Sequence, residues 1–309
     1  MKKFDLLVAG EINPDLILTD PNLEPRFDQT EILVEDTTLT AGSSSVIFSC
    51  GAARLGLSVA FIGVVGKDLF GAFMLDVLKS RAVDISNVIV DENQTTGLSV
   101  ILNRINDRAI LTHTGAINAL HSEQVTDELL VQTRHLHVAS YFLQTSLQPG
   151  MADLFQRAQT LDLTTSLDTN WDPEEKWGGV NELLKHTTVF LPNENEALSL
   201  TGASTVEEAA ERLAAQASIV AVKMGVDGGL VFDGESLYRA PIIPVDVLDT
   251  VGAGDTFDAG FIYGFLQGWP LKRCLELGVV CGSLSTRLAG GITSQPELDE
   301  ALAALDERS

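Results

Sequence analysis

The chain has 309 residues, of which 45% are hydrophobic and 20% charged, and its formal net charge is −23 at pH 7. This length and composition predict one large α/β domain with a substantial core and argue against a disordered chain. The acidity disfavours nucleic acid and anionic membranes as partners, because both require a basic protein surface. A phosphate ligand stays compatible, since backbone N–H groups at a helix start can bind one without Lys or Arg.

The cysteines and the apolar segments bear on the compartment. The three cysteines are odd in number and form no CxxC pair, which argues against a disulfide framework and favours a reducing compartment. No stretch approaches the roughly 18–20 apolar residues of a membrane span. We therefore expect a cytoplasmic protein. The five histidines show no HExxH spacing, and we expect His135 and His137 to lie at the end of a strand.

Short strands alternate with longer helices along the chain. The pattern predicts strands at 4–10 and 59–66 and helices at 45–56 and 68–82. Further strands are expected in "HLHVAS", "TTSLDTN", "TVFLPN", "SIVAVKMG" and "LVFDG", with helices near 149–161, 179–185, 194–201 and 206–217. This alternation predicts a mainly parallel sheet with helices on both faces, and ligands bind such sheets outside the carboxyl ends of the strands.

Two segments depart from the alternation. Residues 16–40 contain short β-like runs with two prolines, and residues 96–113 resemble a hairpin turned at "INDR". We expect them to pair into a small β-flap inserted into a single domain that spans residues 1–309, with a terminal helix after residue 295. Exposed strand edges can pair with a second copy, so a homodimer through the flap is a further expectation.

The stretch "DTVGAGDTF", residues 249–257, places three small residues ahead of a lone acid and an apolar helical run. Gly252, Ala253 and Gly254 leave the backbone bare, so their N–H groups can converge at the start of the helix. Unpaired donors and the positive end of the helix dipole favour an anion there, such as a transferring phosphoryl group. Asp255 follows in the first turn, where its carboxylate can accept the proton of an attacking hydroxyl.

The same stretch, taken alone, also fits a capped helix after a permissive turn. A Walker A loop is excluded because it needs GxxxxGK[ST], and the only GK in the chain, in "GVVGKD", has the wrong spacing. A dinucleotide fingerprint would need a third glycine at Phe257 and a position directly after the first strand. The rest of the chain therefore has to decide between a simple cap and an anion site with a base.

Several stretches, taken in their order along the chain, favour the anion site with a base over the simple helix cap. "DTVGAGDTFDAGF" resembles the C-terminal motif of the ribokinase-like (PfkB) carbohydrate kinases. "AGEINPD" resembles the family's first strand, and "AGSSS" followed by "GAARLG" and "FIGVVGKDLFG" resembles its N-terminal motif. "LTHTGAIN" resembles the end of its lid hairpin. "SLDTNWDP" resembles its central sugar-side strand, and "LPNENEALSLTG" its NxxE motif. The resemblance covers nearly the whole chain. It implies a ribokinase-like three-layer α/β sandwich with a small β-sheet lid, and an alcohol phosphotransferase that uses ATP and Mg²⁺.

Two groups of phosphate-side residues follow from this resemblance. It makes Asp255 the catalytic base and gives the anion hole to the amides of Gly252–Gly254, in agreement with the residues themselves. It also assigns Mg²⁺ and the ATP phosphates to Asn193 and Glu196 of the NxxE motif, largely through water. Without the resemblance, this pair would fit an ordinary helix cap followed by an acid three residues on.

On the acceptor side, the resemblance assigns the sugar contacts. Asn13 and Asp15 of "NPD" would lie at the end of the first strand, where alternate residues share one face. Gly42 would let the sugar approach the backbone and Ser43 would offer it a hydroxyl. Asn170 is a further candidate on the sugar or phosphate side, whereas the nearby Asp168 could be structural.

For the nucleotide, the resemblance places "VKMGVDGG" beside the adenine and ribose and "CGSLSTRLAGG" over the adenine. The candidate contacts in these two stretches are Lys223, Gly225, Gly228, Gly282 and Ser285. Lys223 fits a surface position equally well. Members of the family often bind K⁺ near the catalytic loop, and Asp249 is the candidate ligand for that ion.

The chain departs from the family pattern beside the expected sugar site. Ala41-Gly42 stands where the family usually has two glycines, and Val46 or Ile47 stands where it usually has an asparagine that contacts the sugar. This difference removes a hydroxyl anchor, so the acceptor can differ from ribose or a simple hexose. Trp171 nearby fits either core packing or a stacking surface.

Together these features predict an ATP-dependent kinase that phosphorylates a hydroxyl of a small sugar or sugar acid. Neither the acceptor nor the hydroxyl is fixed by the sequence, because a few pocket contacts decide specificity. One alternative is a nucleoside kinase with the same residues for phosphoryl transfer. Another is a non-catalytic sugar- or nucleotide-sensing protein, against which the intact GAGD and NxxE motifs argue.

Overall fold

The computed structural model describes residues 2–105 and 107–307. Within these ranges, eight strands form one sheet in the order β14-β13-β12-β11-β10-β9-β1-β4. Six strands run parallel: β1 (Phe4–Ala9), β4 (Val59–Ile62), β9 (Thr133–Val138), β10 (Thr164–Leu167), β11 (Val189–Phe190) and β12 (Ile219–Lys223). Two antiparallel strands complete the edge: β13 (Gly229–Phe232) and β14 (Leu237–Ala240). The mainly parallel sheet predicted from the sequence is therefore confirmed.

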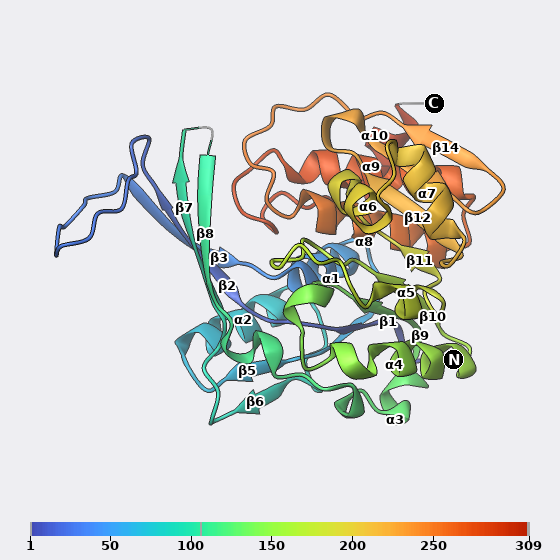
Figure 1. The fold of residues 1–309 in the computed structure, drawn as a ribbon, viewed down its shortest axis with the longest axis horizontal. Helices are drawn as coiled ribbons and strands as arrows, with labels where there is room; N and C mark the ends of the chain where they lie inside the picture. The colour runs from blue at the N-terminus through green and yellow to red at the C-terminus, as the bar shows by residue number, and fades with distance from the viewer. Residues whose placement is uncertain (1, 106, 308–309) are drawn as a thin grey trace.

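Helices cover both faces of this sheet (Figure 1). Leu6 and Val8 of β1 pack into one apolar cluster, and Leu7 and Ala9 pack into another on the opposite face. The first cluster includes residues of α1 (Ser44–Arg54), α2 (Leu69–Ser80), α8 (Ala253–Leu266), α9 (Leu271–Ser285) and α10 (Leu298–Asp306). The second includes residues of α3 (Asp127–Leu130), α4 (Gln148–Thr160), α5 (Val180–Leu184), α6 (Glu194–Thr201) and α7 (Val206–Ala214). Helix α10 confirms the expected terminal helix.

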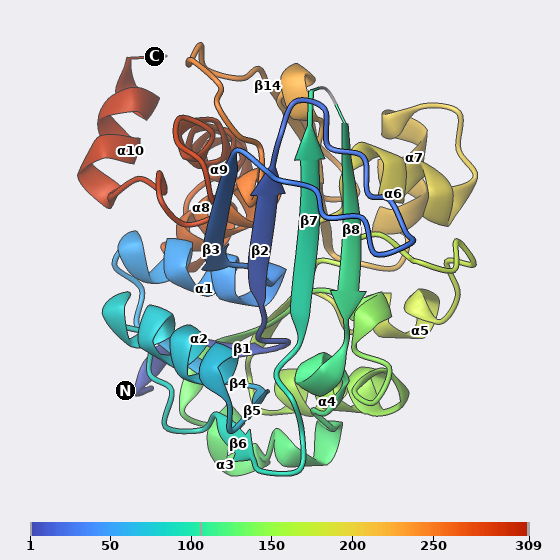
Figure 2. The same ribbon diagram turned by 90° about the vertical axis from the view of Figure 1, so that its left-hand side faces the viewer.

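A separate sheet of four strands projects from this body, and Figure 2 shows its broad face (Figures 1 and 2). Its order is β3-β2-β7-β8, with bounds Asp36–Ala41, Pro14–Thr19, Leu98–Arg104 and Asp107–His113. β2 pairs parallel with β7 and antiparallel with β3, and β7 pairs antiparallel with β8. The two segments that interrupt the helix–strand alternation thus lie side by side.

The expected single strand at 59–66 is wrong, because it is two strands in different sheets. β4 ends at Ile62, and β5 (Val64–Gly66) pairs instead with β6 (Ile89–Asp91) in a two-stranded sheet. Gly63 lies at the junction, where a Cβ would stand 2.4 Å from the carbonyl oxygen of Gly10. The close approach of the two backbones requires a glycine there and lets the chain leave the main sheet.

The expectation that Asn13 and Asp15 lie at the end of the first strand is also wrong. β1 ends at Ala9, and Pro14 opens β2 in the small sheet. Glu11 lies in the link between the two strands. Its buried carboxylate accepts hydrogen bonds from the hydroxyls of Ser45 and Ser140, and it shares the hydroxyl hydrogen of Ser43 with the carbonyl of Glu11 itself. These bonds fix the change in chain direction that separates the two sheets.

His135 and His137 lie inside β9 and not at a strand end. Both are fully buried, and the hydroxyl of Ser166 lies 2.7 Å from Nε2 of His135 and from Nδ1 of His137. Burial lowers the pKa of His135 to about 3 and holds the pKa of His137 well below its ordinary value. Both imidazoles are therefore neutral members of the core.

The three cysteines are buried and unpaired. Their burial among apolar neighbours raises the pKa of each thiol, with Cys50 and Cys274 at about 12. In the described ranges, none of the helices has the length and hydropathy that a membrane crossing needs.

Candidate active site

A cavity of about 650 Å³ lies at the carboxyl ends of the parallel strands. Asp168 and Asn170 follow β10, Asn193 follows β11, and Lys223 ends β12. Across from them lie the first turn of α8 and the last part of α9. The other polar or glycine residues of the lining are Ser44, Arg108, Glu196, Gly225, Gly228, Thr250, Gly254, Asp255, Gly282, Ser283 and Thr286. The cavity thus occupies the place expected for a ligand of such a sheet.

Helix α8 presents its amino terminus to the cavity. Gly252 caps the helix at φ 72°, and a Cβ there would lie 2.9 Å from Cα of Gly291, so the position requires glycine. The N–H of Ala253 donates to the carbonyl of Thr250 at 3.3 Å. The amides of Gly254 and Asp255 belong to the first turn, where no intrahelical partner exists, and no other described residue accepts from them. These two amides are the free donors, and Ala253 is not one of them.

Asp255 is partly buried beside these amides. Burial raises the pKa of its carboxyl to about 7, and the negative charge of Asp168 adds to the rise. The charge of Lys223 and a hydrogen bond with Ser44 act in the opposite direction. The carboxyl group is therefore tuned to exchange a proton near neutral pH, as a general base requires.

Lys223 is not a surface residue, because two buried carboxylates hold it. Its Nζ lies 2.7 Å from Oδ2 of Asp168 and 3.1 Å from Oδ2 of Asp258. Burial alone would lower the pKa of Lys223, but the charges of Asp168, Asp258 and Glu196 raise it above its ordinary value. The ammonium is thus permanently charged. Asp258 escaped sequence reasoning, although its place one turn after Asp255 on α8 was a usable signal.

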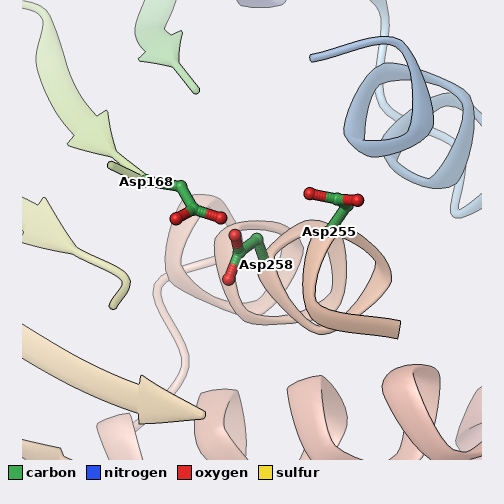
Figure 3. Close-up of side chains that lie close together, drawn as sticks. All are labelled: Asp168, Asp255 and Asp258. Atoms are coloured by element: carbon green, nitrogen blue, oxygen red, sulfur yellow. The ribbon is translucent and has the colours of Figure 1, made fainter. Parts of the chain in front are cut away.

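Asp168, Asp255 and Asp258 each place one carboxylate oxygen within 4.8 Å of the other two (Figure 3). Figure 3 shows Asp168 at the end of its strand and the two other carboxylates on α8. Oδ1 of Asp258 is buried without a hydrogen-bond partner among the described residues. Oxygen donors of this kind suit a hard divalent cation. The ammonium of Lys223 already serves as the cation for Asp168 and Asp258, so Asp255 is the member left without an ion pair.

Asn193 and Glu196 lie together on the cavity wall and also cap α6. Oδ1 of Asn193 accepts from the N–H of Glu196, and Oε2 of Glu196 accepts from the N–H of Asn193, both at 2.9 Å. Burial, together with the negative charge of Asp168, raises the pKa of Glu196 to about 7. The cap and the cavity position are therefore compatible, and the cap fixes both side chains.

The acceptor candidates are divided between the cavity and its surroundings. Asn170 lines the cavity, and its Nδ2 donates to Oγ of Ser44 at 2.5 Å. The hydroxyl of Ser43 caps α1: it donates to the carbonyl of Glu11 at 2.6 Å and accepts from the N–H of Val46 at 3.1 Å. Ser44, which was not predicted, therefore occupies the wall where Ser43 was expected.

Asn13, Asp15 and Gly42 lie outside the lining of the cavity, at the base of the small sheet. A Cβ on Gly42 would stand 2.2 Å from Oδ1 of Asp15, so Gly42 makes room for that carboxylate. Burial raises the pKa of Asp15 to about 6, and the charge of Arg108 opposes the rise. Asn13 is buried, with its Nδ2 donating to the carbonyl of Pro14 at 3.4 Å.

The nucleotide candidates Gly225, Gly228 and Gly282 line the cavity, but Ser285 does not. Its hydroxyl donates to the carbonyl of Gly282 at 2.8 Å, within its own helix. Sequence reasoning missed an apolar wall that consists of Ile242, Ile243, Pro244, Val245, Val247, Phe257 and Val279. The run "PIIPV" after the last strand, apolar yet without helical periodicity, was the available signal.

Four further residues singled out in the sequence lie outside the cavity lining: Asp249 in the loop before α8, Val46 and Ile47 in α1, and Trp171 after β10. Both carboxylate oxygens of Asp249 accept amide hydrogens, from Val251 at 3.0 Å and from Gly290 at 2.9 Å, and the residue does not line the cavity. Val46 is completely buried and Ile47 is 3% exposed, so neither lines the cavity. Trp171 is 47% exposed and meets the ring of Trp177 edge-on at 4.9 Å.

Several known proteins with similar sequences or folds are carbohydrate kinases or are described as such. The family model described as pfkB family carbohydrate kinase matches residues 3–298. The ATP-dependent ribose-1-phosphate kinase of Halopiger xanaduensis is 30% identical over 308 residues, covering 98% of each chain. The 2-dehydro-3-deoxygluconokinase of Bacillus subtilis is 31% identical over 282 residues, covering 86% of each. A crystal structure from E. coli, described as a ribokinase II in complex with ATP and Mg²⁺, has a TM-score of 0.87 at 23% identity and covers 98% of this chain and 99% of that one.

Proposed function

Because this chain belongs to the pfkB family of carbohydrate kinases, we propose that it transfers the terminal phosphoryl group of ATP to a hydroxyl of a small sugar or sugar acid. One observation carries the proposal: the carboxylate of Asp255 lies on the same cavity wall as the free backbone amides of Gly254 and Asp255. A base and an anion site are then adjacent, which is what the transfer requires.

In the proposed reaction, the acceptor hydroxyl lies between Asp255 and the terminal phosphate of ATP. Asp255 accepts the hydroxyl proton as the oxygen–phosphorus bond forms. The amides at the start of α8 stabilise the charge that develops on the phosphoryl oxygens. Lys223 balances part of the negative charge around Asp255, so that the carboxylate can ionise near neutral pH.

The nucleotide would occupy the half of the cavity opposite the small sheet. The apolar wall at 242–247 with Phe257 suits the adenine ring, and Gly225, where a Cβ would meet nothing within 4 Å, leaves the backbone open beside it. Each carboxylate oxygen of Glu196 already accepts one hydrogen bond, from the N–H or the Nδ2 of Asn193. The two residues would therefore hold Mg²⁺ through water. The ion supplies charge neutralisation to the phosphates when it is bound.

The carboxylate of Asp249 remains the candidate ligand of the proposed K⁺ site. Each of its oxygens accepts one backbone amide hydrogen, from Val251 and from Gly290, and keeps a second acceptor position for an ion. Asp249 also ties the loop before α8 to Gly290. Its second role in the proposal is therefore to hold the anion site in shape.

The small sheet is proposed to act as the lid of one domain spanning residues 1–309. It would close over the acceptor, exclude water and limit wasteful hydrolysis of ATP. Leu39 and Leu111 are 41% and 60% exposed on the face of this sheet opposite to Asp15 and Arg108. These apolar side chains support a homodimer through the lid, which sedimentation analysis of the intact protein would test.

The proposal is tested by a screen for ADP release with sugars, sugar acids, inositols and nucleosides. Turnover of a sugar or sugar acid that Asp255→Asn abolishes supports the assignment. Turnover of nucleosides alone would identify a nucleoside kinase with the same residues for phosphoryl transfer. Ligand binding in a calorimeter without ATP consumption across the panel would identify a sensing protein.

A further inference from the structure

Arg108 is a cation on the lid, and its guanidinium has no hydrogen-bond or ion-pair partner among the described residues. It lies on β8 and lines the same cavity as Asp255. The other cationic side chain among the described lining residues, Lys223, is held by two carboxylates. The guanidinium of Arg108 takes part in no hydrogen bond or ion pair recorded within the described ranges. A charged side chain that the fold does not use is available to a ligand.

The strand register places Arg108 on the same face of the small sheet as Asp15. Asp15 on β2 is opposite Ser99 on β7, and Ser99 is opposite Thr112 on β8. Residues opposite each other in a ladder share a face, and so do residues two apart on one strand. Arg108 is four residues from Thr112 and therefore projects to the side that carries Asp15.

The charges of the cavity divide into two zones. Lys223 acts on the carboxyl groups of Asp255 and Glu196, lowering the pKa of both. Arg108 acts on Asp15, where it opposes the effect of burial. Arg108 thus belongs to the side where the acceptor is expected, away from the carboxylates beside the anion site.

We infer that Arg108 binds a carboxylate or phosphate group of the acceptor, and that the acceptor is an anionic sugar derivative; the inference rests on the proposed kinase function. The cavity is lined by Asp168, Glu196 and Asp255, whose charges repel an anionic acceptor unless a cation receives it. The planar guanidinium offers two parallel N–H donors, a geometry that fits carboxylate and phosphate oxygens.

The test compares paired acceptors that differ in one anionic group: gluconate with glucose, and ribose 1-phosphate with ribose. ADP release is measured for the wild type, Arg108→Ala and Arg108→Lys. Arg104→Ala is the matched control, because Arg104 lies on the same hairpin, pairs with Asp107 at 2.8 Å and does not line the cavity. An exposed pair of this kind contributes little to stability.

The wild type is expected to prefer the anionic member of at least one pair by about tenfold or more in kcat/KM. Arg108→Ala is expected to lower kcat/KM for that acceptor by about 10- to 100-fold through its KM, the loss expected for a charged hydrogen bond. The KM for ATP and the turnover of neutral sugars should stay within about twofold, and Arg108→Lys should fall between. Arg104→Ala should behave as the wild type.

Turnover that favours the neutral members would overturn the inference and leave the kinase proposal standing. A rise in the KM for ATP alone in Arg108→Ala would overturn it too, because the guanidinium would then bind the nucleotide. If no acceptor consumes ATP, the kinase proposal fails, and calorimetry with gluconate and ribose 1-phosphate decides the inference. Equal or absent binding in wild type and Arg108→Ala contradicts it, whereas binding weakened about tenfold supports it.

Discussion

Nζ of Lys223 lies 2.7 Å from Oδ2 of Asp168, and this bond joins the ends of β12 and β10 across the intervening strand β11. Asp258 adds a second bond from α8. One buried cation is thus shared between two sheet strands and the helix that carries Asp255. The two bonds hold the proposed base and the carboxyl ends of the strands in a fixed relation, so we expect a change at Lys223 to affect both folding and activity.

Lys223→Met should be strongly destabilising, because it leaves two buried carboxylates without a counter-charge. We expect a loss of about 3–5 kcal/mol in the free energy of unfolding, measured by urea denaturation. Adding Asp258→Asn should recover part of the loss. Lys185→Met, which removes an exposed pair with Glu182, should cost less than about 1 kcal/mol. Equal costs for the two lysine variants would show that the buried pair is unimportant.

Asp255→Asn should remove the proposed base and leave the fold intact. The amide is close in size to the carboxylate, so ATP binding should persist while kcat falls by about 10²- to 10⁴-fold. Steady-state kinetics with the best acceptor of the ADP-release screen measures the loss. Asp299→Asn in the first turn of α10 is the matched control and should keep full activity. Near-normal turnover of Asp255→Asn would refute the base assignment.

The activity should rise with pH around neutrality. Burial raises the pKa of both Asp255 and Glu196 to about 7, and the carboxylate of Asp255 must be ionised to accept a proton. The profile of kcat/KM is therefore expected to climb through an apparent pKa near 7, shared between the interacting acids. A flat profile from pH 5.5 to 8.5 in the wild type would contradict this expectation.

The same two raised pKa values should make the free energy of unfolding fall as the pH rises, whereas the activity rises. Their ordinary values are 3.8 for Asp255 and 4.5 for Glu196, so the folded state holds more protons than the unfolded state between about pH 4 and 7. The stability they contribute is complete below pH 4 and is lost as the pH rises through about 7. Urea denaturation at pH 5 and pH 8 should show a smaller fall for Asp255→Asn than for the wild type.

Two alanine substitutions in the glycine loop should act in different ways. Gly252→Ala forces a side chain into φ 72° and against Gly291, which should cost more than about 1 kcal/mol of stability. A Cβ on Gly254 would only touch Cδ of Lys223 at 3.4 Å, so Gly254→Ala should fold at least as well as the wild type. Its methyl group crowds the free amides, and kcat should still fall. Thermal denaturation and ADP release measure the two effects separately.

The sequence was sufficient where a motif is contiguous. GAGD and NxxE each place their chemistry within a few residues at one helix start, so local physics and a family pattern predict their position. The terminal helix and the main sheet were predictable for a similar reason, because hydrophobic periodicity acts over one element.

Relations between distant elements were not predictable in this way. Asp258 and Lys223 meet across 35 residues of chain, and no local pattern reports such an ion pair. Arg108 reaches the cavity only because of the strand register of the small sheet. The position of "NPD" was not predictable because the hydrogen bonds of Glu11, which fix the turn of the chain between the two sheets, come from two distant segments, Ser43 with Ser45 and Ser140.

The separation of the small sheet from the main sheet also has an evolutionary consequence. The small sheet is formed by residues 14–41 and 98–113, whereas the proposed base and anion site come from the segment that contains α8. On the proposed function, substitutions on one hairpin would exchange one acceptor for another and leave the proposed base and anion site unchanged. Acceptor preference would then diverge among related chains at the sheet face that carries Arg108.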